Sequence, residues 1–169
     1  MELGVTIPLR RYLRRPVPPD GREPDRRFCG DLHVITLQGR KSLLAVHCHS
    51  RYIFVLFDLS AAEWSELPAV FAAGLRRSLT DAGMTGAAVS AYAERAGACS
   101  VTRTHGRREV AFLNRAWEDV LALDVCLDET SREQPLLDHA VNARPSRCAG
   151  LDGLSPAAER LADSFLLTP

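Results

Sequence analysis

The chain has 169 residues, a length typical of one domain, and its hydrophobic fraction of 46% is sufficient for a buried core. No run approaches the ~18 consecutive apolar residues of a membrane-spanning helix, and residues 1–9 lack the apolar region of a signal peptide. The sequence therefore predicts a cytoplasmic protein without a membrane partner. Its formal net charge is zero, with 21 Lys and Arg against 21 Asp and Glu, which excludes a uniformly basic or acidic chain.

The charges are nevertheless unevenly placed along the chain. Up to Arg115 there are 17 Lys and Arg against 11 Asp and Glu, and from Ala116 onward there are 4 against 10. This asymmetry indicates a basic face for one partner and an acidic C-terminal part. The five cysteines are scattered without a C-x-x-C pair, which predicts reduced thiols rather than a disulfide framework or a zinc ribbon. They are Cys29, Cys48, Cys99, Cys126 and Cys148.

Residues 1–30 are predicted to form a basic, Pro-rich N-terminal arm. Leu9–Arg15 is compatible with one turn of basic helix or with an extended edge strand, and the prolines after it indicate a loop. Basic residues with one aromatic can bind nucleic acid, although such an arm is also common as a solvated, mobile segment. The arginines concerned are Arg10, Arg11, Arg14 and Arg15.

Residues 31–125 are predicted to form an α+β core domain. Three strands, Asp31–Leu37, Ser42–Cys48 and Tyr52–Leu59, are separated by short turns and predict an antiparallel meander. The third strand is apolar on both faces, so we expect it to be central and covered on both sides. A fourth strand, Ala98–Arg103, is expected to join this antiparallel sheet.

Helices are expected between and after these strands. Ser60 and Glu63 form a capping box, which predicts a helix start. Pro68 is expected to open a longer helix that ends near Gly83, and Thr85 to cap another that ends at Gly97. A further helix carries an apolar stripe at Val110, Leu113, Trp117, Val120 and Leu121.

The turn between the fourth strand and this last helix is rich in arginine. In one interpretation, Arg103, Arg107 and Arg108 make an anion site beside a helix N-terminus. In the other, they form a solvated rim that protects the end of the sheet. The candidate residues for binding an anion or nucleic acid are Arg40, Lys41, Arg103, Thr104, His105, Arg107, Arg108 and Asn114.

Three histidines are the candidates for a metal site. His47 and His49 share one face of a strand, and His33 faces His47 only in one of the possible hairpin registers. An H-x-H pattern at a strand end does not define a zinc site, so we predict neither a metal nor a cofactor.

Residues 126–169 are predicted to form an acidic C-terminal extension that packs on the core. Gln134–Asn142 is expected to be helical. Ser155 and Pro156 are expected to begin a last helix over Ala157–Leu166.

Three short motifs in this sequence match those of a known protein family. An R-K-x-L-L-x-V hairpin spans Arg40–Val46, a V-L-F run spans Val55–Phe57, and a T-R-T-x-x-R segment spans Thr102–Arg107, with Val110 and Asn114 following. Over about residues 31–120 the chain resembles a bacterial family of small uncharacterised domains of the plasmid ORF-3-like kind. The resemblance implies that Thr104, Arg107 and Asn114 act together as a hydrogen-bonded brace. Arg103 replaces a Lys of that pattern, and His47-Cys48 replaces Asn and an acidic residue.

Three functions follow from these features. The first is a small cytosolic module that binds nucleic acid or phosphate, with the separate arginine groups converging near His105. The second is an accessory protein-interaction subunit of a mobile-element, toxin–antitoxin or defence system. The third is a hydrolase or nuclease that uses a histidine with Asp31 or Asp58, although G-x-S-x-G, H-E-x-x-H, Walker and G-x-G-x-x-G motifs are all missing. No catalytic residue is therefore assigned.

Overall fold

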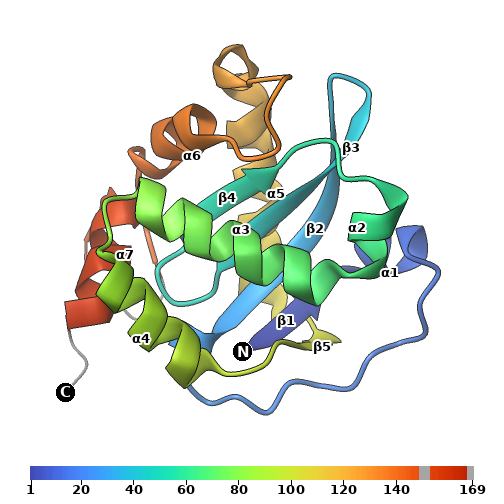
Figure 1. Cartoon of the computed structure of the whole chain (residues 1–169), viewed down its shortest axis with the longest axis horizontal. Coiled ribbons are helices and arrows are strands. Elements are labelled where there is room, and N and C mark those ends of the chain that lie inside the picture. Colours follow the sequence, from blue (N-terminus) through green and yellow to red (C-terminus); the bar gives the residue numbers. More distant parts are fainter. Residues whose placement is uncertain (149–152, 167–169) are drawn as a thin grey trace.

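A five-stranded mixed sheet lies at the centre of the computed structural model, which describes residues 1–148 and 153–166 (Figure 1). The strand order is β4-β3-β2-β1-β5. In chain order the strands are β1 (Glu2–Val5), β2 (Cys29–Leu37), β3 (Arg40–His47), β4 (Ile53–Leu56) and β5 (Ser100–Arg103).

The α+β class is confirmed, but the predicted antiparallel sheet of three strands plus a fourth is wrong. β3 pairs with β2 and with β4, and both pairs are antiparallel. β1 lies between β2 and β5 and is parallel to both. β1 was missed because it has only four residues and its partners lie far along the chain. The division of the chain at residues 30 and 125 stays a prediction, although the first segment contributes this inner strand.

Helices cover both faces of the sheet. Figure 1 shows α3 (Leu67–Asp81) and α4 (Gly86–Ala96) on one face and α5 (Arg107–Ala122) on the other. α6 (Pro135–Asn142) packs beside α5. The remaining elements are α1 (Ile7–Tyr12), η1 (Arg26–Phe28), α2 (Ala61–Ser65), η2 (Asp124–Cys126), α7 (Ala157–Leu166) and the short pair β6 (Pro145–Ser146) and β7 (Ser155–Pro156).

Local signals set most helix starts. The Ser60–Glu63 capping box is present in both directions at α2, and the Thr85 side chain caps α4. Thr6 caps α1, where Pro8 occupies the first turn and costs no hydrogen bond. These short-range contacts explain why α2 and α4 begin where the sequence predicts. α3 has no side-chain cap and begins with Pro68 in its first turn.

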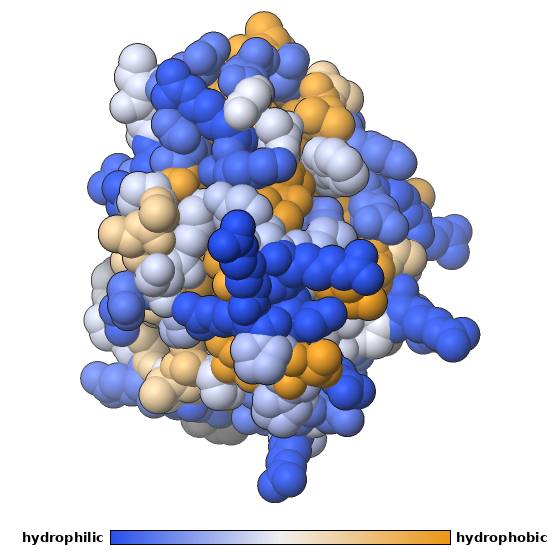
Figure 2. Space-filling view, turned by 90° about the vertical axis from the view of Figure 1, so that its right-hand side faces the viewer, coloured by the Kyte–Doolittle hydropathy of each residue, from blue (hydrophilic) through white to orange (hydrophobic). Residues whose placement is uncertain are grey.

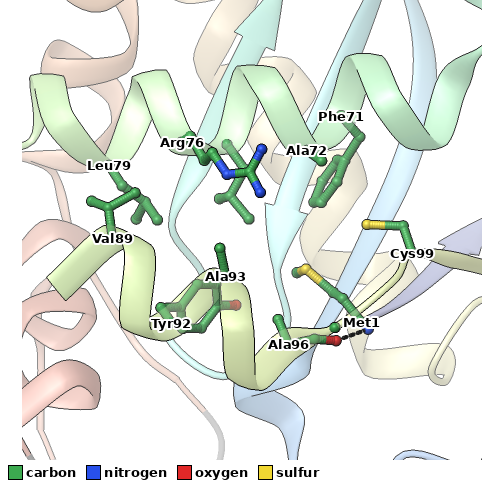
Figure 3. A pocket seen from close by; sticks show the side chains of 12 residues that line it. Met1, Phe71, Ala72, Arg76, Leu79, Val89, Tyr92, Ala93, Ala96 and Cys99 are labelled. Atoms are coloured by element: carbon green, nitrogen blue, oxygen red, sulfur yellow. Dashed lines mark hydrogen bonds between the residues drawn. The ribbon is translucent and has the colours of Figure 1, made fainter. Parts of the chain in front are cut away.

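Two apolar clusters hold the layers together. Leu32, Leu43 and Phe54 belong to the cluster on the α3 and α4 side, while Ile35, Leu44 and Val55 belong to the cluster on the α5 and α6 side. Neighbouring residues on one strand thus serve opposite faces, as strand geometry requires. A small apolar cavity of about 40 Å³ between α3 and α4 is lined by Phe71, Leu79 and Val89, with Arg76 beside it (Figure 3).

β4 is covered on both faces but is an edge strand rather than the predicted central one. Its outer edge is paired by side chains of α6 and, at Leu56, by an isolated backbone bridge to Glu133. Asn142 accepts the Ile53 N–H at 2.8 Å and Asp138 accepts the Val55 N–H at 3.0 Å. Because these backbone groups are satisfied, the edge cannot pair with a second chain.

The C-terminal part packs on the rest of the chain through buried apolar residues of α6 and α7, namely Leu137, Val141, Ala157 and Leu161. The observed bounds of α7 match the predicted helix. Residues 149–152 and 167–169 of the predicted extension lie outside the described residues. None of the described helices has both the length and the apolar character that crossing a membrane requires.

Candidate functional site

A groove of about 470 Å³ opens where the parallel strands β1 and β5 end. Ligands commonly bind at the carboxyl ends of parallel strands, because the chain turns away there and leaves a crevice. We call this feature the Arg10–Arg103 groove. Its apolar lining comes from Val5, Ile7, Pro8, Val17, Pro18 and Val110, and its polar lining from Thr6, Arg10, His33, Arg103, Thr104 and Asn114.

The two arginines reach the groove from different segments. Arg10 belongs to α1, whereas Arg103 is the last residue of β5. The Arg103 guanidinium lies 3.3 Å from Asp20, but both side chains are more than half exposed, so this ion pair contributes little. An Arg10 nitrogen donates a long 3.5 Å hydrogen bond to the Arg15 carbonyl. Both guanidinium groups therefore retain donors for an incoming anion.

His33 and Thr6 form the inner polar wall of the groove. His33 Nδ1 and Thr6 Oγ1 lie 2.8 Å apart, and the Trp117 ring packs edge-on against the imidazole. Burial lowers the pKa of His33, so the ring is neutral near pH 7. A neutral imidazole adds hydrogen-bonding capacity without adding charge.

The predicted site residues are only partly brought together. Arg103, Thr104 and Asn114 line the groove, while Arg107 and Arg108 are exposed on the first turn of α5 and lie outside its lining. No hydrogen bond within the described part of the chain joins Thr104, Arg107 and Asn114, so the structure does not form the brace that the resemblance implies.

Arg40 and Lys41 lie apart from the other candidates. They are at the end of the β2–β3 hairpin, six residues along β2 from Asp31, or roughly 20 Å. Arg40 pairs with Asp58 at 2.7 Å, and Lys41 donates to Thr36 at 2.8 Å. Of the arginine groups predicted to converge, Arg10 and Arg103 line the same groove, whereas Arg40 and Lys41 at the hairpin tip do not.

Figure 2 shows the face of the molecule that carries α1 and the hairpin. Strongly hydrophilic groups gather in its middle, directly beside hydrophobic patches. Arg11, Arg14 and Arg15 of the N-terminal segment are exposed. Exposed basic side chains therefore surround α1.

The candidate histidines do not form one cluster. The register pairs Gly30 with His47 and Leu44 with His33, so His33 and His47 point to opposite faces of the sheet. His47 is fully buried and bonds to Ser50 Oγ and the Arg27 carbonyl. Burial lowers its pKa to about 4. It is a neutral structural side chain.

A second, buried polar cluster lies beneath the start of α5. His105 Nδ1 is 2.7 Å from Asp31 Oδ1, and the His105 N–H donates to the same carboxylate at 3.2 Å. Glu2 Oε2 lies 3.5 Å from His105 Nε2 on the other side of the ring. Cys29 and Cys48 complete this His105 cluster.

Gly4 makes this cluster possible. A Cβ at Gly4 would lie 2.0 Å from Asp31 Oδ1 and 2.9 Å from His105 Nδ1. Because strand β1 presents no side chain at this point, residues 104–106 can fold across it and reach Asp31 on β2. A glycine is thus required in the middle of an inner strand, where it is normally unfavourable.

Opposite charges balance within the His105 cluster. Burial alone would lower the pKa of His105, but its contacts with Asp31, Cys29 and Cys48 outweigh burial and raise it to about 12. Burial would raise the pKa of Glu2, but the N–H groups of Arg22 and Glu23 and the nearby His105 lower it overall. The ring is therefore held between two carboxylates, which favour its protonated form.

The His105 cluster does not resemble an activated thiol site. Burial raises the pKa of Cys48 to about 11, so its thiol is protonated at neutral pH. Cys29 and Cys48 are both buried. Neither thiol has the exposure that a nucleophile needs.

Sequence reasoning missed the partners of His105 and most of the groove wall. Asp31 is 74 residues from His105, and no local pattern connects them. A signal did exist at Thr6, which with Pro8 has the composition of a helix N-terminus and would have placed Arg10 on a short helix. The other lining residues follow only from the position of β1.

A second cavity of about 400 Å³ near α5 is lined by four arginines, Arg51, Arg115, Arg144 and Arg147. Arg51 is paired with Glu109 at 3.1 Å and Arg144 with Asp119 at 2.7 Å. Carboxylates of the chain therefore already neutralise part of its charge.

A family profile matches most of the chain. The profile of a family described as a domain of unknown function, DUF6933, matches residues 2–159. This range is wider than the expected 31–120 and includes β1, the groove and the start of α7. No curated protein matches the chain.

Proposed function

The chain belongs to the DUF6933 family, and we propose that it is a small binding module whose Arg10–Arg103 groove takes an anionic ligand with an apolar body. One observation supports this most. Two guanidinium groups from separate elements line a single groove whose other walls are largely apolar. Ligand sites commonly combine apolar walls with a few polar groups that fix orientation.

The chemistry of the lining limits the ligand class. Arginine is suited to carboxylate and phosphate groups because its planar N–H donors can bind two oxygens at once. Val17 and Val110 provide apolar contact for the rest of the ligand, and His33 and Asn114 offer neutral hydrogen bonds. We therefore expect a small organic carboxylate or phosphate monoester.

The volume of the groove agrees with a compact ligand. Small-molecule sites span roughly 300–1,000 Å³, and the groove has about 470 Å³. An extended nucleic acid would in addition need the exposed Arg11, Arg14 and Arg15 of the adjacent surface. Binding of a short single strand that weakens steeply between about 50 and 200 mM salt would favour that extended mode.

The test compares arginines inside and outside the groove. Aryl phosphates and aryl carboxylates are titrated against the full chain by calorimetry, with inorganic phosphate as a reference. Arg103→Gln is expected to weaken binding about 10- to 100-fold, because one charge-assisted hydrogen bond contributes roughly 1.5–3 kcal/mol.

Arg40→Gln is the matched control, because it removes one arginine from the distant hairpin tip. It is expected to leave the affinity unchanged. An equal loss in both variants, or no binding of any compound to the unaltered chain, would rule out the groove as the site.

A protein partner is the second candidate, favoured by one further feature. Trp117 and Leu121 are exposed by 36% and 44% and lie four residues apart on α5, so they form an apolar stripe. This stripe begins beside His33 of the groove. Leu121→Ala should weaken a protein complex while sparing the binding of small anions, because Leu121 lies outside the groove lining.

A further inference from the structure

Two unpaired polar atoms face each other in the His105 cluster. His105 Nε2 and Glu2 Oε2 are both buried, lack a hydrogen-bond partner and lie 3.5 Å apart. The His105 side chain is only 3% exposed. We infer that these two atoms, together with the Cys29 thiolate, bind a divalent transition-metal ion of the Zn²⁺ class.

The donor set suits such an ion. A carboxylate oxygen, a thiolate sulfur and an imidazole nitrogen are all common ligands of Zn²⁺. The three candidate atoms of Glu2, Cys29 and His105 lie within 4.8 Å of one another. Bonds of about 2.0–2.3 Å in tetrahedral geometry would place them roughly 3.3–3.8 Å apart. A contraction of about 1–1.5 Å at most is needed, which small side-chain rotations can supply.

Asp31 orients the imidazole for this role. Its bond to His105 Nδ1 at 2.7 Å fixes the ring and leaves Nε2 directed toward Glu2. Histidines that bind metal typically donate their other ring N–H to a carboxylate in this way, which also raises the basicity of the ligand. The cluster thus contains both the ligands and the outer carboxylate of a metal site.

A second combination of residues is less suitable. Asp31, Cys48 and His105 also have donor atoms within 4.8 Å. Their metal would have to bind at Nδ1, but that nitrogen is already bonded to Asp31 at 2.7 Å, while Cys48 Sγ lies 3.6 Å from it. The geometry therefore selects Cys29 over Cys48 as the thiolate ligand.

Gly21 leaves room for the ion. A Cβ at Gly21 would lie 2.3 Å from Glu2 Oε2 and 3.4 Å from His105 Nε2. Gly21 is exposed and follows the proline-rich loop, so backbone without a side chain is what covers these two atoms on that side. A side chain at Gly21 would therefore occupy the position beside these two atoms that an ion has to use.

The competing interpretation is a brace in which an imidazolium is held between Asp31 and Glu2. In that state a proton occupies Nε2, and a metal ion has to replace it and the Cys29 proton. Both interpretations use the same contacts among His105, Asp31 and Glu2, and they differ in the role of the Cys29 thiol. A brace does not need Cys29, whereas a metal site binds through its sulfur.

Cobalt titration of the full chain distinguishes them. Metal-stripped protein is titrated with Co²⁺, and thiolate-to-cobalt charge-transfer absorption in the near ultraviolet is recorded. Zn²⁺ is then added to displace the cobalt, and bound zinc is counted by elemental analysis. We expect one ion per chain and loss of the absorption band on zinc addition. The absence of both the band and bound zinc would overturn the proposal.

Matched variants assign the ligands. Cys29→Ser is expected to abolish the absorption band, and Glu2→Gln, which retains the shape of the side chain, to weaken Zn²⁺ binding at least tenfold. Gly21→Ala should weaken it as well, because its Cβ occupies the position beside Glu2 Oε2. Cys48→Ser should retain the band. Circular dichroism confirms that each variant is folded, and a band lost in Cys48→Ser but retained in Cys29→Ser would overturn the assignment.

Discussion

At the scale of single residues, Gly4 decides whether the His105 cluster can form. Gly4→Ala would place a methyl group 2.0 Å from Asp31 Oδ1 and 2.8 Å from the Thr104 backbone. The Thr104 backbone cannot move as easily as a side-chain end, so the Asp31–His105 contact should break. We expect a loss of about 2–4 kcal/mol in unfolding free energy, from overpacking and a disrupted buried ion pair.

Urea unfolding measures this loss. Gly86→Ala is the control, because nothing lies within 4 Å of the added Cβ and the residue begins α4. That variant should be neutral or more stable by up to about 1 kcal/mol. Equal stability of Gly4→Ala and the unaltered chain would show that the Asp31–His105 contact does not depend on this glycine.

Single residues also show how much of the site can be predicted from the sequence. Arg103 and Thr104 were predicted as candidates because they follow a strand and precede a helix, which is a local pattern. The link between His105 and Asp31 could not be predicted, since it depends on β1 passing between them without a side chain. Arg10 was recognised only as part of a basic arm, because its position in the groove depends on the same strand.

At the scale of elements, α6 protects the edge of β4. Asn142 lies across the edge, accepting the Ile53 N–H at 2.8 Å and donating to the Ile53 carbonyl at 2.6 Å. It is 1% exposed, so water cannot replace these bonds. Asn142→Ala should therefore lower the unfolding free energy by about 2–4 kcal/mol, because two buried backbone groups lose their partner.

Hydrogen exchange of the Ile53 amide gives the local readout for this change, and urea unfolding gives the global one. Asn114→Ala removes an exposed amide from α5 and should change stability by less than about 0.5 kcal/mol. Unaltered exchange at Ile53 in Asn142→Ala would contradict the edge-capping role.

The elements themselves divide into those that local chemistry specifies and those that it does not. The capping box at Ser60 predicts its helix because its contacts span only three residues. The predicted last helix is present over Ala157–Leu166, but Ser155 and Pro156 belong to β7 before it. β1 pairs with residues about 27 and 98 positions away, and its four residues carry too little periodicity to be detected. Apolar residues on both faces of β4 likewise predict a central strand. β4 can instead lie at the edge of the sheet because side chains of α6 bind its outer backbone groups.

At the scale of the whole molecule, the acidic C-terminal part does not neutralise the groove. Within the described residues, the carboxylates that pair with Arg40, Arg51 and Arg103 come from Asp58, Glu109 and Asp20. All three lie before residue 116, where the basic excess is found. The acidic excess after residue 116 therefore supplies none of these three partners.

The opposite pKa shifts of two histidines should give the whole protein a stability maximum near pH 6.5. The pKa of His47 is about 4 in the folded chain, against an ordinary 6.5, so the unfolded chain takes up a proton in this interval that the folded chain does not. The His47 contribution therefore falls by roughly 2–4 kcal/mol as the pH drops from 6.5 to 4. His33 and His49, whose pKa values burial also lowers, act in the same direction. Burial raises the pKa of Asp138 well above its usual value, so this carboxyl acts in the opposite direction within the interval.

His105 has the reverse effect, because its pKa is raised to about 12. Its contribution is complete below pH 6.5 and is lost progressively as the pH rises from there toward 12. Urea unfolding across this range should show both slopes. His47→Gln should flatten the slope between pH 6.5 and 4.5, above the range where the lowered pKa values of Glu2 and Asp25 matter, and leave the alkaline slope intact. An acid slope that is unchanged in His47→Gln would show that this histidine is not buried in its neutral form.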